Sequence, residues 1–448
     1  MKMKKFSVLI SVCISVLLVW VAYCFSSFAY IEGVNPESDI IKAEIQNYDT
    51  IKNTFEGTFL DADGNVLCYA LKKGSGGIID HECYQRLIGF STGLMYGQSG
   101  LRSIYHEELW TPDKKTSKGA TITLTTNSKI QSIAYEEISS YSEGESCAVV
   151  LENKTGKVIA LASANSKYNL DYNNITPESY AKAAEVDGYF VDSWNTMAAP
   201  GSVMKAATAL SIAEKGLNEE IYHDTGTELI DGYAFKNYGT QSYGDVSLNK
   251  GVQHSINTYF AHMGLKVGSF ALRDAYERFM IGKTLKLDFA TVKSAHNLDN
   301  DVSKTNIAAT AFGQGKLMLT PINIALIAQS IANDGIMLKP YVVDSVVTDS
   351  KDTLVKGKTE KLSKIGDKDV VKIIKEALYL TADSYEIDAK YNIGAKSGTA
   401  QMGNGLNRAS FMAFNDDYTV VIVVNNTSRM GGSLKSSVLR IFDALSLL

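Results

Sequence analysis

The sequence predicts an α+β protein in which the main sheet of a large domain takes strands from both ends of that domain. Two β-hairpins are indicated, each by a pair of β-rich runs around a short polar turn. Helical periodicity lies between them, after Gly201 and again from 321 to 333. Strands at both ends with helices enclosed favour an α+β domain, and no repeat of 20–50 residues interrupts the order. The hairpin runs are 147–151 with 158–162 and 409–414 with 418–424.

Length and composition exclude several classes of protein. The 448 residues suffice for two or three domains, and 45% apolar against 21% charged residues excludes a disordered chain. The net charge of -5 argues against nucleic-acid binding, which needs a basic excess. Six His and five scattered Cys show no zinc-ligand spacing, so no metal is expected. Cys68 and Cys83 leave two readings open, a disulfide or small buried thiols, while Cys147 has no evident partner.

The N-terminal segment predicts a transmembrane anchor at 6–29 after a cytoplasmic tail at 1–5. No charged residue occurs from Phe6 to Ile31, and about 20 apolar residues are enough for a helix to cross a bilayer. Lysines precede the run and acidic residues follow it, so the positive-inside rule places the rest of the chain outside the cytoplasm. A cleaved signal peptide is the alternative, although the run exceeds the usual apolar core of ~7–15 residues.

Residues 30–118 are predicted to form a small non-catalytic module. The run Asp61-Ala62-Asp63-Gly64-Asn65 indicates a hairpin turn, and 101–109 indicates a short helix. A polar stretch at 111–119 that contains a proline is typical of a linker. The larger domain is therefore assigned to 119–448.

The strongest candidate for chemistry is a Ser-x-x-Lys motif, Ser202 and Lys205, at the start of a helical run. Residues three apart on a helix share a face, so the Lys205 amine is expected to reach the Ser202 hydroxyl. A serine hydroxyl is a poor nucleophile until a base removes its proton. Lys205 can be that base if burial among apolar neighbours lowers its pKa. The helix N-terminus also favours negative charge on the serine oxygen.

Single motifs of this kind occur by chance, since Ser247 to Lys250 has the same spacing and Lys154-Thr155-Gly156 is a Lys-Thr-Gly triplet. One ordered set has suitable surroundings at each position. It consists of Ser202 and Lys205, then Ser255-Ile256-Asn257, then Lys396-Ser397-Gly398-Thr399. Motifs of these three types are the signature of penicillin-binding proteins and class A β-lactamases.

With its surroundings, this set resembles a class B penicillin-binding protein, a membrane-anchored peptidoglycan transpeptidase. Thr258-Tyr259-Phe260 extends the second motif as in that family, and 312–315 with 319–321 resembles its Gly-Gln-Gly…Thr-Pro segment. Residues 154–160 resemble the hairpin that opens the family's catalytic domain, and 96–101 resembles part of its N-terminal module. The resemblance implies a β-lactamase/D,D-peptidase-like domain, an antiparallel sheet with helices on both sides, after a small N-terminal module and a transmembrane helix.

The resemblance also implies catalytic roles. Ser202 would attack the carbonyl between two terminal D-alanines of a stem peptide and form an acyl-enzyme. Lys205 would take the serine proton, and Ser255 would relay a proton to the departing D-alanine. Asn257 would hydrogen-bond the substrate backbone. An acceptor amine of a second stem peptide would then resolve the acyl-enzyme.

The third motif is implied to bind substrate. Lys396 would add positive potential near the nucleophile, and the Ser397 and Thr399 hydroxyls would bind a substrate carboxylate, with Gly398 between them. Backbone N–H groups of Ser202 and Thr399 would form the oxyanion hole. Ser397 stands where the family often has Thr, which preserves the hydroxyl.

The implied partners are peptidoglycan stem peptides, β-lactam antibiotics, a separate membrane glycosyltransferase and cell-wall assembly proteins. The segment between anchor and catalytic domain is too short for a glycosyltransferase module. No cofactor is implied. The alternatives are a D,D-carboxypeptidase, a β-lactamase, and a β-lactam sensor or inactive scaffold.

Overall fold

The computed structural model describes residues 48–448 except 93–96, 142, 187, 300 and 404. The tail predicted at 1–5 and the anchor predicted at 6–29 lie outside the described residues. Among the helices that are described, none has both the length and the apolar character needed to cross a membrane.

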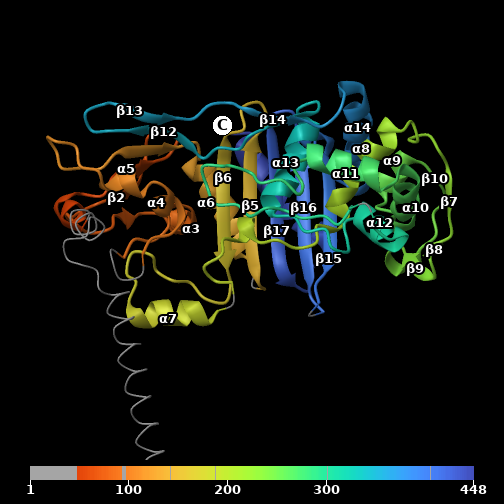
Figure 1. The fold of residues 1–448 in the computed structure, drawn as a ribbon, viewed down its shortest axis with the longest axis horizontal. Coiled ribbons are helices and arrows are strands. Elements are labelled where there is room, and N and C mark those ends of the chain that lie inside the picture. Colours follow the sequence, from red (N-terminus) through yellow and green to blue (C-terminus); the bar gives the residue numbers. More distant parts are fainter. Residues whose placement is uncertain (1–47, 93–96, 142, 187, 300, 404) are drawn as a thin grey trace, which may run out of the picture.

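The core of the protein is a five-stranded antiparallel sheet (Figure 1). Strands from the two ends of the large domain meet at its centre, where β17 pairs with β5. Both predicted hairpins are confirmed as β5/β6 and β16/β17, and β15 forms one edge. The strand order is β15 (Gly394–Gln401), β16 (Asn407–Phe414), β17 (Tyr418–Thr427), β5 (Glu145–Glu152) and β6 (Val158–Asn165).

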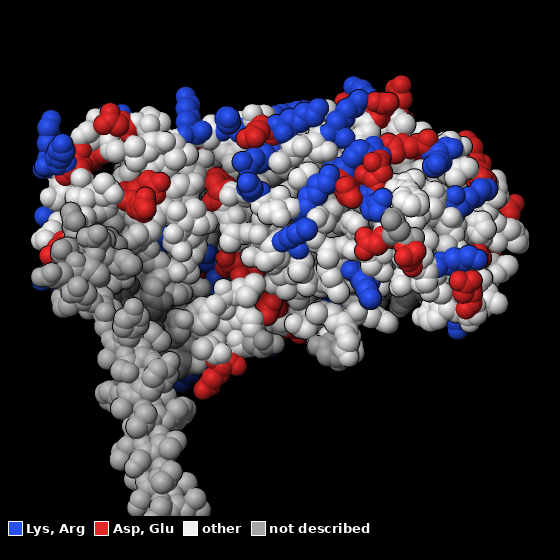
Figure 2. All heavy atoms as spheres, viewed as in Figure 1, with Lys and Arg blue, Asp and Glu red and all other residues white. Residues whose placement is uncertain are grey.

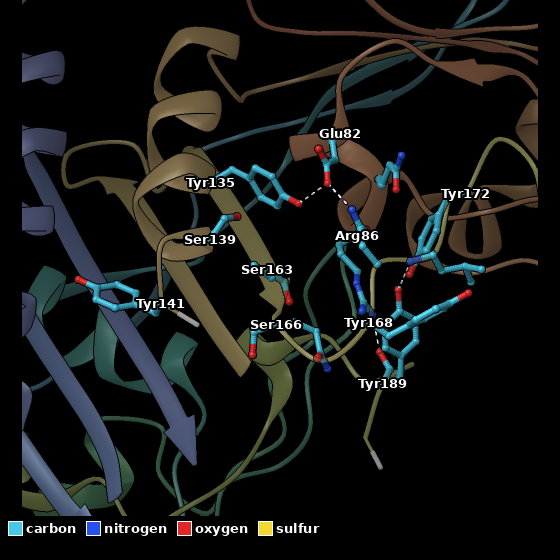
Figure 3. A pocket seen from close by; sticks show the side chains of 15 residues that line it. Glu82, Arg86, Tyr135, Ser139, Tyr141, Ser163, Ser166, Tyr168, Tyr172 and Tyr189 are labelled. Carbon is cyan, nitrogen blue, oxygen red and sulfur yellow. Dashed lines mark hydrogen bonds between the residues drawn. The ribbon is translucent and has the colours of Figure 1, made fainter. Parts of the chain in front are cut away.

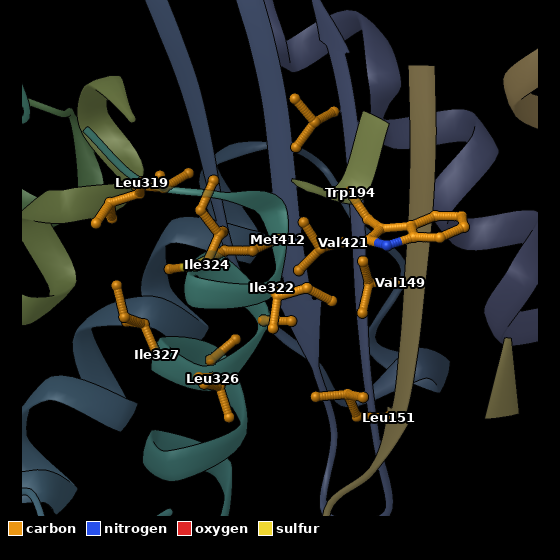
Figure 4. Close-up of a cluster of buried hydrophobic side chains, with 14 of the residues drawn as sticks. Val149, Leu151, Trp194, Leu319, Ile322, Ile324, Leu326, Ile327, Met412 and Val421 are labelled. Atoms are coloured by element: carbon orange, nitrogen blue, oxygen red, sulfur yellow. The ribbon is translucent and has the colours of Figure 1, made fainter. Parts of the chain in front are cut away.

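Helices cover both faces of this sheet. On one face, α13 (Pro321–Ala332) lays Ile322 and Leu326 against Val149 and Val421, with Trp194 at the side (Figure 4). The helix α8 (Lys205–Glu214) belongs to the same apolar layer. On the other face, α6 (Ser128–Ser139) and α15 (Lys435–Leu445) bury their apolar sides against the alternate residues of the strands. This alternation is the two-residue period of a strand that is buried on both faces.

A second sheet joins the N-terminal segment to the large domain. It has six strands, and the helices α3 (Gln85–Ile88), α4 (Gly100–Ile104) and α5 (His106–Trp110) lie near it (Figure 1). The hairpin predicted at 61–65 is confirmed, with Asp61 accepting hydrogen bonds from the backbone of Asp63 and Asn65. Three of the six strands come from beyond residue 118. The strand order is β13 (Thr353–Lys356), β12 (Val343–Val347), β4 (Thr121–Leu124), β1 (Thr58–Leu60), β2 (Val66–Tyr69) and β3 (Ile78–Ile79).

The remaining elements frame one end of the central sheet or connect its parts. Three small two-stranded sheets pair β7 with β10, β8 with β9, and β11 with β14. Their strands are β7 (Tyr222–Asp224), β8 (Thr227–Ile230), β9 (Tyr233–Lys236), β10 (Gly244–Val246), β11 (Ile336–Leu338) and β14 (Lys361–Lys364). The helices are α7 (Pro177–Glu185), α9 (Leu248–Gln253), α10 (Asn257–Val267), α11 (Ser269–Arg278), α12 (Lys304–Ala311) and α14 (Lys368–Ser384).

The visible face of the molecule carries mixed charge, and the described thiols are buried. Figure 2 shows basic and acidic side chains interspersed on the visible face rather than gathered in a basic stripe, as the net charge of -5 leads one to expect. In the part of the chain that the structure describes, Cys68, Cys83 and Cys147 are free and buried. The open question of a Cys68–Cys83 bridge is thereby resolved in favour of buried thiols.

Candidate active site

Ser202 lies in a single 3-10 turn, Gly201–Met204, that leads directly into α8. Gly201 has a φ of 63°, and a Cβ atom there would lie 3.1 Å from the backbone of Thr399. Only glycine combines this left-handed conformation with so close an approach at little cost. The Gly201 N–H also donates to Gly313 O at 2.9 Å. The first and third motifs are therefore in direct contact through their backbones.

Lys205 is completely buried one turn further along. Its Nζ atom donates to Ser255 O at 2.6 Å and to Asn257 Oδ1 at 2.6 Å, and it lies 3.1 Å from Ser255 Oγ. Burial, and then repulsion from the Lys396 ammonium, lower the pKa of Lys205 well below its ordinary 10.5. The structure thus buries the Lys205 amine, the condition under which the sequence lets it act as a base.

The sequence led us to expect the Lys205 amine at the Ser202 hydroxyl, and the structure places the amine differently. Among the residues that the structure describes, the Lys205 amine has its hydrogen bonds with the second motif, and no side-chain hydrogen bond joins Ser202 to it. The spacing places the two residues in adjacent turns, and the buried amine donates instead to Ser255 O and Asn257 Oδ1. The serine stays half-buried at the start of the turn.

The second motif is positioned by the N-terminus of α10. Ser255 has a φ of 56°, a left-handed conformation that non-glycine residues seldom adopt outside sites that require it. Asn257 begins the helix, and its Nδ2 donates to Lys236 O at 3.0 Å. The next backbone N–H, that of Thr258, donates to Asn237 Oδ1 at 3.1 Å. The β8/β9 hairpin thus holds the start of α10 in place.

The third motif lies on the edge strand β15. Lys396 is fully buried and acts electrostatically on Lys205, whereas Ser397 and Thr399 are half-buried. A Cβ at Gly398 would lie 2.8 Å from Pro200 O, so this glycine lets the strand approach the turn that carries Ser202. The Thr399 hydroxyl accepts a hydrogen bond from Gly431 N at 2.9 Å. All eight predicted residues of the three motifs therefore lie in one region.

Two neighbouring residues were missed by sequence reasoning. The Tyr385 hydroxyl lies 2.7 Å from Ser397 Oγ. Arg408 on β16 is buried and donates to Ala198 O at 2.9 Å and Leu319 O at 2.8 Å, which fixes the segment before Ser202. Neither residue stands in a recognisable motif, so no local signal marked them.

The two chance motifs are structural. Ser247 is the residue before α9, and Lys250 donates to the carbonyls of Tyr243 and Asp245. Lys154-Thr155-Gly156 forms the turn between β5 and β6, where Gly156 has a φ of 81°.

Two cavities lie elsewhere, beside the short helix α3. One cavity of about 190 Å³ is lined by several tyrosines and by Glu82 and Arg86. The Tyr135 hydroxyl donates a hydrogen bond to the Glu82 carboxylate there (Figure 3). A second of about 290 Å³ shares Arg86. Neither cavity is lined by a residue of the three motifs. The candidate active site is therefore identified by the contacts among the motif residues and not by the size of a cavity. No cluster of metal-ligating side chains occurs among the described residues.

Comparison with known proteins matches most of the chain to one protein family. A family model described as penicillin binding protein transpeptidase domain matches residues 146–444. Stage V sporulation protein D of Bacillus subtilis is 27% identical over 364 residues, which cover 73% of this chain and 53% of that protein. Peptidoglycan D,D-transpeptidase PbpA of Mycobacterium tuberculosis is 29% identical over 243 residues, covering 51% of this chain and 49% of that protein. The chain thus spans about half the length of the curated relatives it matches.

Solved structures share the fold. The D,D-transpeptidase domain of a peptidoglycan glycosyltransferase from Eggerthella lenta superposes with a TM-score of 0.78 at 24% identity, covering 88% of this chain and all of that one. Penicillin-binding protein A from M. tuberculosis, solved as a ceftriaxone acyl-enzyme complex, gives a TM-score of 0.79 at 22% identity, covering 90% of this chain and all of that one.

Proposed function

Because the chain belongs to the penicillin-binding protein transpeptidase family, we propose that it is a serine acyltransferase that cross-links peptidoglycan stem peptides. It forms an acyl-enzyme with the donor peptide and is acylated by β-lactams in the same way. The observation that carries the proposal is the buried Lys205 amine, bonded to Ser255 and Asn257 beside the Ser202 turn. A desolvated amine in that place is a base next to a nucleophile.

Acylation starts at Ser202. Its Oγ bonds to the carbonyl carbon between two D-alanines while its proton passes to Lys205. An uncharged Lys205 has two N–H donors, and the carbonyl-type oxygens of Ser255 and Asn257 use both. Its lone pair is then left for a proton from a hydroxyl, either that of Ser202 or that of Ser255.

Departure of the D-alanine completes the first half of the reaction. Lys205, now protonated, passes its proton through the Ser255 hydroxyl, 3.1 Å away, to the nitrogen that leaves as the C–N bond breaks. The amine of a second stem peptide then attacks the ester, loses a proton by the reverse route, and releases Ser202 with a new amide bond formed. Asn257 aligns the donor backbone.

The third motif supplies electrostatic stabilisation. The Ser202 and Thr399 N–H groups are assigned to the oxyanion, supported by the contact of the two backbones at Gly201. Lys396, Ser397, Gly398 and Thr399 are assigned to the substrate, with the two hydroxyls binding its carboxylate. Together with burial, the larger cause, Lys396 lowers the pKa of Lys205 and so favours the uncharged amine.

The cellular setting is part of the proposal. The protein is anchored in the cell membrane by residues 6–29, with residues 1–5 in the cytoplasm and the 119–448 domain outside. Residues 30–118 act as a non-catalytic dimerisation or pedestal module. A separate membrane glycosyltransferase makes the glycan strands, and cell-wall assembly proteins bring the two activities together.

Covalent labelling tests the proposal. Fluorescent penicillin should label the wild-type protein, and mass spectrometry of the labelled peptide should find the adduct on Ser202. Ser202→Ala should abolish labelling, whereas Ser247→Ala, the matched change in the chance motif, should not. Equal labelling of the Ser202→Ala protein would refute the assignment.

The fate of the acyl group separates the alternatives. An adduct that persists for hours supports a synthase, and one lost within minutes indicates a β-lactamase. With a stem-peptide donor and a free acceptor amine, a cross-linked product supports the transpeptidase. Release of D-alanine with no cross-link indicates a D,D-carboxypeptidase instead.

A further inference from the structure

Tyr385 is the C-terminal cap of α14, and its hydroxyl lies against the substrate-binding motif on β15. The Ser397 N–H donates to the Tyr385 hydroxyl at 3.1 Å, and the two hydroxyl oxygens are 2.7 Å apart. The ring is wedged against Phe411, with centroids 5.5 Å apart, and Phe411 is the cross-strand partner of Ser397. The Tyr385 backbone is also fixed, because Lys435 Nζ donates to its carbonyl at 2.7 Å.

The hydrogen-bond inventory of the phenol sets the direction of each bond. A tyrosine hydroxyl has one proton and two acceptor positions. The Ser397 N–H occupies one acceptor position, and the positive charge of Lys396 acts on the same oxygen. Burial alone raises the pKa of Tyr385, but Lys396 and Ser397 outweigh it, so the pKa is lower than usual. Among the described residues, Ser397 Oγ, 2.7 Å away, is the acceptor within hydrogen-bond distance of the phenol, so the single phenol proton is assigned to the bond with Ser397 Oγ.

This arrangement has a consequence for Ser397. When its oxygen accepts the Tyr385 proton, its own hydroxyl proton turns away from the tyrosine and is free for a ligand. We propose that Tyr385 is a positioning residue for the substrate carboxylate, because it presents the Ser397 hydroxyl to that group as a hydrogen-bond donor. The inference rests on the proposed function, in which Ser397 binds the carboxylate.

Two ligands that differ only in their carboxylate can test whether Tyr385 acts through that group. Benzylpenicillin carries a carboxylate, and its methyl ester lacks the charge while keeping the reactive ring. Tyr385→Phe in the full-length chain should lower the acylation rate constant for benzylpenicillin about 10-fold or more, the effect of losing one hydrogen bond to a charged group. The rate constant for the methyl ester should stay within about twofold, since a neutral ester accepts only a weak bond.

Tyr379→Phe is the matched control. Tyr379 lies on the same helix, where its ring meets Phe414 edge-on and no hydrogen bond to its hydroxyl occurs among the described residues. This variant should leave both rate constants unchanged. An equal loss for both ligands in Tyr385→Phe, or no loss for either, overturns the inference.

A second variant links the effect to Ser397. Ser397→Ala should show the same selective loss with benzylpenicillin, and the double variant should lose no more than either single one, because both act on one bond. Additive losses overturn the inference, and so does an unaffected Ser397→Ala protein. If wild-type protein is not acylated at all, the proposed function fails rather than the role of Tyr385.

Discussion

The Nζ atom of Lys205 lies 2.6 Å from Oδ1 of Asn257, which joins the first motif to the second across 52 residues of sequence. This hydrogen bond holds the Lys205 amine in a fully buried position, where a positive charge is costly because water does not solvate it. The ease with which Lys205 gains or loses a proton therefore depends on this buried setting.

The acylation rate should depend on pH through Lys205. The protonated amine cannot accept the Ser202 proton, and its pKa is well below 10.5 because of burial and Lys396. The rate constant for penicillin acylation should therefore rise with pH through that lowered pKa and level off above it. Stopped-flow measurement across pH 5–10 tests this; a flat profile contradicts it.

Lys205→Arg should remove the base, since a guanidinium stays protonated. Acylation at neutral pH should fall by about 10²–10⁴. Lys215→Arg, an exposed position just beyond the same helix, should keep the wild-type rate. A Lys205→Arg protein that is acylated as fast as wild type would show that Lys205 is not the base.

Lys396→Ala should move the pH profile to higher pH. Removal of a neighbouring positive charge makes protonation of Lys205 easier, so the pKa of Lys205 rises and the rising limb follows it. Lys372→Ala on α14, where the side chain is 70% exposed, should leave the limb in place. A shift in the opposite direction would contradict the electrostatic link.

Gly201→Ala should impair both stability and acylation. The φ of 63° costs an alanine about 1–2 kcal/mol, and its methyl group would press on the Thr399 backbone. Displacing an oxyanion donor costs about 10²–10³ in rate. Gly216→Ala has a similar φ of 69°, yet nothing described lies within 4 Å of its Cβ, so it should lower Tm and spare acylation. If Gly201→Ala and Gly216→Ala lowered the acylation rate equally, the loss would not be due to the contact of Gly201 with Thr399.

Leu326→Ala in α13 should destabilise the protein without touching the motifs. The side chain is fully buried in the layer between helix and sheet, and such truncations cost about 2–5 kcal/mol. Leu229→Ala, at a side chain that is 70% exposed, should change Tm little. Comparison of the two melting curves provides the measurement, and similar Tm values would contradict the assigned core.

Local patterns in the sequence predicted much of the central domain. The hairpins β1/β2, β5/β6 and β16/β17 are confirmed, as are the helices after Gly201 and from Pro321. The resemblance to class B penicillin-binding proteins and the sheet with helices on both sides are also confirmed. The helix expected at 101–109 is instead two short helices that meet at Tyr105. The roles of the individual site residues stay predictions.

Local sequence patterns did not predict which strands pair when they lie far apart in the sequence. The strand β12 pairs with β4 across more than 200 residues, and no local period reveals a partner at that distance. Tyr385 was missed for a related reason. It ends an ordinary amphipathic helix, and only the folded chain brings its hydroxyl to Ser397.

The shared N-terminal sheet has a practical consequence for expression of this protein. A fragment cut at residue 119 would keep β4 and β12 but lose β1, so one side of β4 would expose unpaired N–H and C=O groups. Exposed edges of this kind recruit other chains and promote aggregation. A soluble version that retains residues from 48 onwards keeps every described strand of that sheet and is the better starting point for crystallisation.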